Sequence, residues 1–205
     1  MRIASEHILV GLGPAAARVE ASTALAEVRD AIRTVVWPPG ATNFTIHPQS
    51  GKRGGEGNGV VPIREAFVKN AVDKGWDSER PFPVTAPREK SDLGPIDVSK
   101  LFGADLVAAE WETGNVSSSH RTVNKLFLGL VEGVLSAGIW IVPTRQLARY
   151  LTDRIGNLEE VRRYFDLWRR IPIVDGLLLV IGVEQDAESL DVPRIRKGTD
   201  GRAKG

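Results

Sequence analysis

The sequence predicts an α/β protein with a central mixed β-sheet flanked by helices on both sides. Segments with apolar residues at helical spacing alternate along the chain with short runs rich in β-branched residues. Two such runs, 95–101 and 105–112, are separated by three residues and predict a hairpin. A continuous apolar run at 177–183 is typical of a central strand. This order of elements fits a mixed sheet with helices packed against it.

The first part of the chain supplies a helix and a strand. Residues 1–13 are ambiguous between a strand and the start of a helix. Between 15 and 36 the apolar positions recur at helical spacing, and the sequence Trp-Pro-Pro-Gly at 37–40 ends that helix. Alternation over 43–47 predicts a strand, and we interpret His47 as a strand-end residue and not as a catalytic one.

A glycine-rich segment at 51–59 has the composition of a phosphate-binding loop but not its spacing. Lys52 is followed by Arg53, where a phosphate-binding loop needs Ser or Thr, and the segment is expected to be a loop whose basic residues contact a backbone phosphate. A helix is predicted over 62–75, and the polar, proline-rich residues 77–92 are predicted to be a loop.

The remaining elements follow from periodicity and capping signals. Ser117 is a plausible N-cap, and Asn157 with Glu160 forms a capping-box pattern. The predicted elements are a helix over 117–136 with a broad apolar stripe, a strand over 139–142, a short helix over 145–152, a helix over 158–168 and the strand over 177–183. A mobile basic tail is expected from about residue 193.

Length and composition indicate one domain spanning residues 1–205. The chain has 42% hydrophobic and 26% charged residues and no cysteine, which excludes disulfides and cysteine-based zinc sites. No apolar run reaches membrane-spanning length and no signal-peptide pattern is present, so we expect a cytoplasmic protein. Because the net charge is only +1, a nucleic-acid site would have to be a local basic surface.

The hairpin carries the chemistry that the sequence predicts. Residues two apart on a strand share a face, so Glu110 and Glu112 point to the same side and Trp111 to the other. Asp97 lies on the partner strand. Three carboxylates this close cannot all stay ionised unless protons or a cation bind between them, which indicates a metal site. The Ser-rich helix start that follows, with Arg121, suits contacts to phosphates or bases.

Acidic pairs on strands are also common on solvated faces, and Glu65 alone is best interpreted as a surface residue near a helix N-terminus. An Asp followed one strand later by an acidic-x-basic pair is the pattern of PD-(D/E)xK nucleases, although here the third member is Glu112 and not Lys. Several motifs in a fixed order add to it: Asn58-Gly-Val-Val-Pro-Ile-Arg-Glu65, Gly94-Pro-Ile-Asp-Val98, Glu110-Trp-Glu-Thr-Gly-Asn115, Tyr150-Leu-Thr-Asp-Arg154 and Lys197-Gly-Thr-Asp-Gly201.

Together these motifs resemble the BamHI family of type II restriction endonucleases, a restriction endonuclease-like branch of the PD-(D/E)xK superfamily, from about Trp37 to the C-terminus. The resemblance implies a site-specific deoxyribonuclease in which Asp97, Glu110 and Glu112 are catalytic and Glu65 is a fourth acidic residue. It further implies that Asp97, Glu110 and Glu65 bind Mg²⁺, with Mn²⁺ as a substitute, and that Glu112 is the general base.

The residues matching the base readers of the family are Asn115, Ser117, Arg121, Asp153 and Arg154. Because these side chains match in type, the resemblance implies cleavage of double-stranded DNA at GGATCC after the first G, with four-base 5′ overhangs. A palindrome is read most simply by a two-fold dimer, here through helices 117–136 and 158–168, with an ion pair between Glu132 and Arg169 across the interface. A cognate DNA methyltransferase would be functionally linked. The alternatives are a PD-(D/E)xK nuclease of other specificity and a non-catalytic DNA-binding protein of the same fold.

Overall fold

The computed structural model describes residues 1–49, 57–82, 94–112, 114–152 and 154–197. A six-stranded sheet runs through the middle of the molecule in the order β1-β7-β6-β5-β4-β3. Strands β5, β6 and β7 are parallel, whereas β1, β4 and β3 pair antiparallel with their neighbours. The predicted mixed sheet is therefore confirmed. Its strands are β1 (Arg2–Leu12), β3 (Asp77–Arg80), β4 (Ile96–Phe102), β5 (Asp105–Trp111), β6 (Ala137–Pro143) and β7 (Gly176–Glu184).

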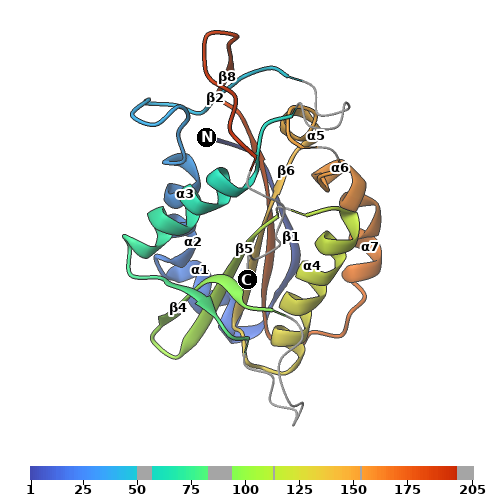
Figure 1. Cartoon of the computed structure of the whole chain (residues 1–205). Helices are drawn as coiled ribbons and strands as arrows, with labels where there is room; N and C mark the ends of the chain where they lie inside the picture. The colour runs from blue at the N-terminus through green and yellow to red at the C-terminus, as the bar shows by residue number, and fades with distance from the viewer. Residues whose placement is uncertain (50–56, 83–93, 113, 153, 198–205) are drawn as a thin grey trace, which may run out of the picture.

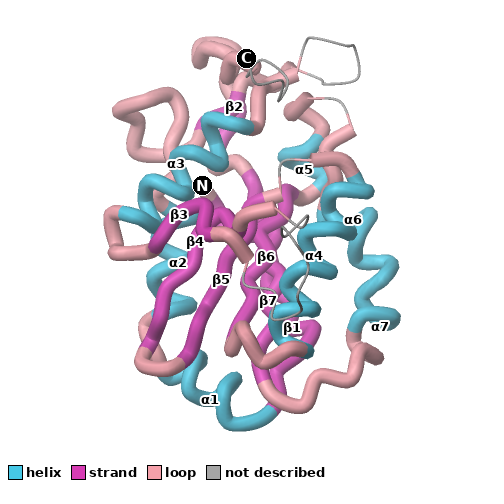
Figure 2. The backbone as a smooth tube through the Cα atoms, turned by 60° about the horizontal axis from the view of Figure 1, so that its bottom comes forward, coloured by secondary structure: helices cyan, strands magenta, loops and turns pink. Residues whose placement is uncertain are grey.

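Helices cover both faces of this sheet (Figures 1 and 2). One face is covered by α1 (Gly13–Ala21), α2 (Ala24–Arg33) and α3 (Val61–Val72). The other is covered by α4 (Val116–Val131), α6 (Leu158–Val161), the 3₁₀ turn η1 (Arg162–Tyr164) and α7 (Phe165–Trp168). The short helix α5 (Arg145–Ala148) follows β6, and a small second sheet joins β2 (Thr45–Ile46) to β8 (Ala187–Glu188). Two hydrophobic clusters, one on each face, form the core.

Several segments differ from the elements that periodicity predicts. The ambiguous N-terminus is the long edge strand β1, and the helix expected over 15–36 is two helices, α1 and α2. The loop prediction for 77–92 is wrong for residues 77–80, which form β3. All four residues of β3 are exposed, so no alternation of apolar and polar residues marks the strand. The helix expected over 158–168 is divided by η1.

Two asparagines cap the helices on the α4 side of the sheet. Asn115, and not the predicted Ser117, is the N-cap of α4, and its Oδ1 accepts a hydrogen bond from the Ser118 backbone N–H at 3.1 Å. The predicted cap at Asn157 is confirmed, because its Oδ1 accepts a hydrogen bond from the Glu160 backbone N–H at 3.2 Å. The start of α4 is therefore fixed by the side chain of a predicted base reader.

Residues 193–197, which the sequence predicts to begin a mobile tail, are instead packed against the rest of the protein. Ile195 is buried, its N–H donates to Asn58 Oδ1 at 3.0 Å, and its carbonyl accepts from the Gly59 N–H at 2.9 Å. Asn58 is itself fully buried and also donates to the backbone carbonyls of His47 and Tyr150. The rest of the tail, residues 198–205, lies outside the described residues.

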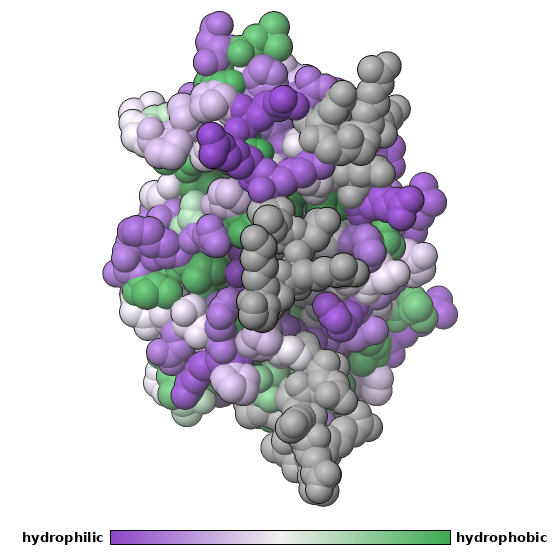
Figure 3. All heavy atoms as spheres, viewed as in Figure 1, coloured by the Kyte–Doolittle hydropathy of each residue, from purple (hydrophilic) through white to green (hydrophobic). Residues whose placement is uncertain are grey.

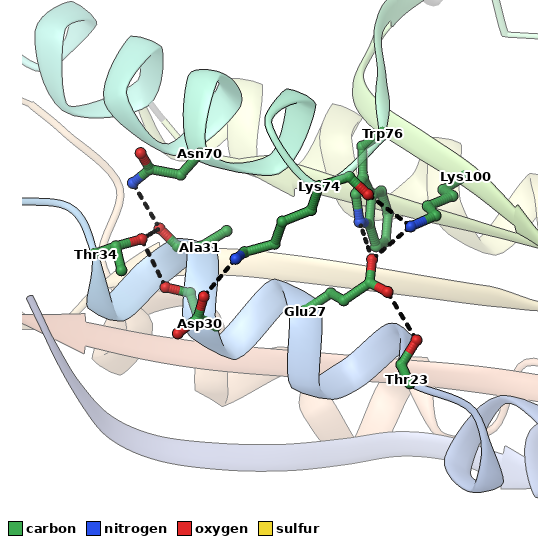
Figure 4. Close-up of polar contacts among 9 residues, drawn as sticks. All are labelled: Thr23, Glu27, Asp30, Ala31, Thr34, Asn70, Lys74, Trp76 and Lys100. Atoms are coloured by element: carbon green, nitrogen blue, oxygen red, sulfur yellow. Dashed lines mark hydrogen bonds and ion pairs between the residues drawn. The ribbon is translucent and has the colours of Figure 1, made fainter.

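A polar network fastens β4 to the helices on the first face of the sheet (Figure 4). The Lys100 ammonium donates to Glu27 Oε2 at 2.8 Å and to the Lys74 carbonyl at 2.7 Å. The Trp76 indole N–H donates to the same Glu27 oxygen at 2.9 Å. Strand β4 is thus anchored by Lys100 three residues after Asp97. In the described part of the chain no helix is long and apolar enough to cross a membrane.

Candidate active site

A cavity of about 270 Å³ lies where β4, β5 and the start of α4 meet. It contains all three carboxylates that the hairpin predicts: Asp97, Glu110 and Glu112. The other lining residues are Gly94, Pro95, Trp111, Gly114, Ser118, Arg121, Thr122 and Lys125. The cavity is a polar site and not an apolar ligand pocket, because its lining includes three carboxylates, an arginine and a lysine. On the face of the molecule in Figure 3, the coloured residues are mostly hydrophilic, with hydrophobic residues in small separate patches.

Strand register brings the first two carboxylates together. Val98 pairs with Ala109 in the antiparallel hairpin. Asp97 precedes Val98 and Glu110 follows Ala109, so these two carboxylates lie opposite one another. The Trp111 backbone N–H donates to Asp97 Oδ2 at 2.8 Å. The Trp111 ring lies on the opposite face, where it packs against Phe67 with ring centroids 5.2 Å apart. The predicted alternation of the two glutamates with the tryptophan is thus confirmed.

Glu110 is a buried carboxylate with a cationic neighbour. The Lys125 ammonium, from α4, contacts Glu110 Oε1. Burial, followed by the charge of Asp97, raises the pKa of Glu110 to about 7, and Lys125 opposes this shift. Glu110 therefore changes its protonation state near neutral pH.

Glu112 is also buried but has no cationic partner among the described residues. Its Oε1 accepts a hydrogen bond from the Gly114 backbone N–H at 2.7 Å. Its Oε2 is buried and makes no hydrogen bond within the part of the chain that the structure describes. Burial raises the pKa of Glu112, and the Gly114 N–H and the nearby Ser119 and Trp140 side chains oppose that shift. A buried carboxylate with one free oxygen and a raised pKa can take up a proton.

Two further residues that the hairpin pattern misses belong to this site. Arg64, from α3, donates to Asp97 Oδ1 through Nε at 2.8 Å and through Nη2 at 2.6 Å. The same Nη2 reaches Glu79 Oε1 at 3.2 Å. In β3, Ser78 pairs with Val98 and Arg80 with Ile96, so Glu79 lies beside Asp97. No sequence spacing links these residues, because they come from different elements.

Glu65 is not brought to these carboxylates. It follows Arg64 on α3, is exposed, and does not line the cavity. Successive helical residues point about 100° apart, so the helix that directs Arg64 to Asp97 directs Glu65 elsewhere. Glu79 is likewise exposed and outside the cavity lining, but it shares the Arg64 guanidinium with Asp97, and on this geometry it is better placed than Glu65 to be the fourth acidic residue.

The donor set fits a hard divalent cation. The described lining residues of the cavity offer carboxylate oxygens and no sulfur or imidazole, and Mg²⁺, Ca²⁺ and Mn²⁺ prefer such oxygen ligands. Within the described ranges no three acidic or histidine side chains form a ready-made metal cluster. The ion pairs of Asp97 with Arg64 and of Glu110 with Lys125 account for this, since each draws a carboxylate toward a protein cation. The orphaned Oε2 of Glu112 remains an available oxygen.

The predicted base readers gather around the start of α4. Asn115, Ser117 and Arg154 line a second cavity of about 330 Å³, together with Val116, Ile155 and Glu160. Arg121 lines the carboxylate cavity itself. Asp153 lies outside the described residues. The segment after Arg154 is held against α4, because the Gly156 N–H donates to the Gly114 carbonyl at 2.9 Å. A Cβ at Gly156 would lie 2.3 Å from Ser119 Oγ, so a larger residue at this position would require the Ser119 side chain to move.

Comparisons with known proteins find restriction endonucleases. The family model "Restriction endonuclease BamHI" matches residues 1–202. The type II restriction enzyme OkrAI of Oceanobacter kriegii is 42% identical over 179 residues, which cover 87% of this chain and 88% of the relative. The type II restriction enzyme BamHI of Bacillus amyloliquefaciens is 40% identical over 183 residues, covering 87% and 81%.

A solved structure shows the same fold at lower sequence similarity. The restriction endonuclease BglII in complex with a DNA 16-mer superposes with a TM-score of 0.64 at 13% identity, covering 91% of this chain and 79% of that chain. The restriction endonuclease-like fold is thus confirmed, and the family match extends over nearly the whole sequence. The chain belongs to the BamHI family of type II restriction endonucleases, which are DNA hydrolases.

Proposed function

We propose that this restriction endonuclease is a Mg²⁺-dependent homodimer that cleaves double-stranded DNA at GGATCC after the first G. The observation that carries the proposal is the 40% identity to BamHI, with all three hairpin carboxylates in one buried cavity beside the predicted base readers. A nuclease that cuts such a site also needs its host sites protected, so we propose a functional link to a cognate DNA methyltransferase.

Asp97 and Glu110 are the residues proposed to hold the metal. They lie opposite one another on paired strands and present oxygen atoms to one cavity. Bound there, Mg²⁺ would polarise the scissile phosphate and stabilise the leaving oxygen. Arg64 and Lys125 would have to share or release their carboxylate oxygens when the metal binds. Mn²⁺, which accepts the same donors, is proposed as a substitute.

Glu112 is proposed as the general base. Its Oε1 is fixed by the Gly114 N–H, so Oε2 is the oxygen with capacity to accept a proton from the attacking water. Burial raises its pKa above that of an ordinary glutamate, which makes the carboxylate more basic. The prediction that Glu65 completes the metal shell has less support, since the geometry favours Glu79 for the fourth acidic position.

The recognition surface is proposed to be the start of α4 together with the segment around Arg154. Arginine forks pair with guanine O6 and N7, asparagine suits an adenine edge, and aspartate accepts from cytosine N4. Asn115, Ser117 and Arg154 share one cavity, and Arg121 lines the carboxylate cavity itself. Asp153 completes the proposed set. This arrangement would place the base-reading groups next to the cutting groups at the start of one helix.

The dimer is proposed to form through α4 and the segment α6–η1–α7. Val131, Tyr164 and Leu167 are exposed apolar residues on these elements. A palindromic site matches a two-fold axis, which would bring two copies of this surface together. Arg169 pairs with Asp166 within the chain at 3.0 Å, so the proposed pair with Glu132 of a partner would compete with that contact. The apolar residues would carry most of the dimer stability, since an exposed ion pair contributes at most about 1 kcal/mol.

The general-base assignment is tested by replacing Glu112 and measuring single-turnover cleavage of a duplex containing GGATCC. Glu112→Gln keeps the shape but not the basicity, and it is expected to slow cleavage by about 100-fold or more while DNA binding in Ca²⁺ stays close to that of the wild type. Glu20→Gln, an exposed acidic site on α1, is the control and should cleave normally.

The outcome of the same assay with Glu112→Ala decides the assignment. If this variant cleaves at the wild-type rate in Mg²⁺, Glu112 is not the base. Glu112→Lys is informative in a different way. Retained cleavage would show that the position needs a polar partner for the phosphate or water and not a proton acceptor.

A further inference from the structure

Lys125 is a buried lysine in the carboxylate cavity, and the mechanism above gives it no role. Its side chain is only 6% exposed, and it lines the cavity from α4. Lysine is almost never buried to this degree unless its charge is paired. A buried charge at a reaction site therefore points to a role beyond packing.

The ammonium of Lys125 is held at two points. It contacts Glu110 Oε1 and donates a hydrogen bond to the Pro95 carbonyl at 2.7 Å. Pro95 leads into β4 and Glu110 lies on β5, so one side chain from α4 joins both strands that carry the carboxylates. The Glu110 side chain is equally buried, at 7% exposed. Buried ion pairs of this kind contribute little net stability, because desolvation offsets the attraction between the charges.

The charge balance of the cavity indicates what the lysine contributes. Three carboxylates line it, and a DNA phosphate approaching them adds a further negative charge. Among the described lining residues only Lys125 and Arg121 are cationic. Arg121 is exposed and proposed to read a base, whereas Lys125 is buried against the carboxylates. In a buried site a fixed charge acts more strongly than in water.

We propose that Lys125 is a positioning residue that holds Glu110 and gives the carboxylate cavity a positive charge, which reduces its repulsion of the scissile phosphate. Because Arg121 and Lys125 are one helical turn apart on the same face of α4, the helix that carries the readers also holds Glu110 in place. The inference rests on the proposed function, and it adds a residue that links recognition to the cutting site.

The test measures DNA binding in EDTA and in Ca²⁺, by fluorescence anisotropy with a labelled duplex containing GGATCC. Lys125→Met keeps the length of the side chain and removes its charge. Binding in EDTA is expected to weaken about tenfold and Ca²⁺ to restore most of it, so the stimulation by Ca²⁺ rises about tenfold over the wild type. Lys125→Arg should remain within about threefold of the wild type.

A matched control separates this role from general loss of an ion pair. Lys100→Met breaks the Lys100–Glu27 pair on the far side of β4, which is outside the cavity (Figure 4). It should lower thermal stability and leave the Ca²⁺ stimulation at the wild-type value. Equal stimulation in Lys125→Met, Lys100→Met and the wild type would overturn the proposal.

A second variant covers the case in which Lys125→Met does not fold. Lys125→Met combined with Glu110→Gln removes both charges and leaves the net charge of the cavity unchanged. It is expected to bind the duplex in EDTA as the wild type does and to lose the response to Ca²⁺. If the double variant binds in EDTA about tenfold more weakly, charge balance is not the role of Lys125. If the wild type itself does not bind the duplex, the proposed function fails instead.

Discussion

At the scale of single residues, the three carboxylates of the cavity differ in what neutralises them. Asp97 is held by Arg64, Glu110 by Lys125, and Glu112 by a backbone N–H. Asp97 and Glu110 are thus balanced by side-chain cations, which a bound metal ion could replace. Glu112 keeps an oxygen without a protein partner among the described residues, which suits it to accept a proton.

The raised pKa of Glu110 predicts how cation binding depends on pH. Below its pKa of about 7 this carboxyl is protonated and must lose a proton before it can bind a metal. Affinity for Ca²⁺ is therefore expected to rise by up to about tenfold per pH unit toward pH 7 and to level off above it. Isothermal titration calorimetry of the enzyme–duplex complex at a series of pH values checks this. The Glu110→Gln variant should lack this rise, and a flat wild-type profile would contradict the assignment.

At the scale of elements, strand β3 shows why part of the site could not be predicted from the sequence. The hairpin β4–β5 follows from its alternation and its short turn, and the carboxylates on it follow from the period of two. Strand β3 has the sequence Asp-Ser-Glu-Arg and is exposed at the sheet edge, so it has no hydrophobic pattern. Its place in the sheet is set by pairing with β4, the next strand along the chain, and not by a pattern within its own residues. Arg64 and Glu79 are brought to Asp97 only by that tertiary packing.

Helix boundaries and caps also depart from the sequence prediction at two places. The apolar residues of 15–36 keep nearly one helical phase, but the chain bends at residues 22–23 between α1 and α2. Asn115 caps α4 where Ser117 fits the propensity equally well. The buried strand β7 lies where the sequence predicts it, since a short, continuous apolar run is typical of a strand that is covered on both faces.

The position of β3 leads to a prediction that distinguishes two acidic residues. Glu79 shares the guanidinium of Arg64 with Asp97, whereas Glu65 points away from the cavity. Glu79→Gln is expected to reduce the cleavage rate about tenfold or more, because it disturbs the group next to the metal-binding carboxylate. Glu65→Gln should cleave within about twofold of the wild type. Cleavage under single-turnover conditions measures both. If Glu65→Gln cleaved more slowly than Glu79→Gln, Glu65 and not Glu79 would be the fourth acidic residue of the site.

At the scale of the whole molecule, the two faces of the sheet contribute differently to the proposed function. The α1–α3 side contains one hydrophobic cluster and the network around Glu27 and Lys100 (Figures 1 and 4). The α4 side carries the proposed readers and the proposed dimer surface. Two copies joined through α4 would bring two sets of base-reading residues and two carboxylate cavities to one palindrome. Each cavity would then serve one DNA strand.

The dimer surface can be tested with a single charge. Leu167 on α7 is 63% exposed, and burying an arginine in its place in a dimer interface would be unfavourable. Leu167→Arg is expected to sediment as a monomer at protein concentrations where the wild type is a dimer. Leu101→Arg, at a similarly exposed leucine near the hairpin turn, is the matched control and should remain dimeric. A wild type that sediments as a monomer at micromolar concentration would refute the proposed assembly.

The proposed function depends above all on cleavage at one palindrome, and sequencing the ends that the enzyme produces measures this cleavage directly. A mixture of plasmids with and without GGATCC is digested in Mg²⁺, and parallel samples receive EDTA or the Asp97→Asn variant. We expect ends cut after the first G of GGATCC, with four-base 5′ overhangs, and no cutting in EDTA or by the variant. Ends at another sequence, or cleavage that persists in EDTA, would contradict the proposed function.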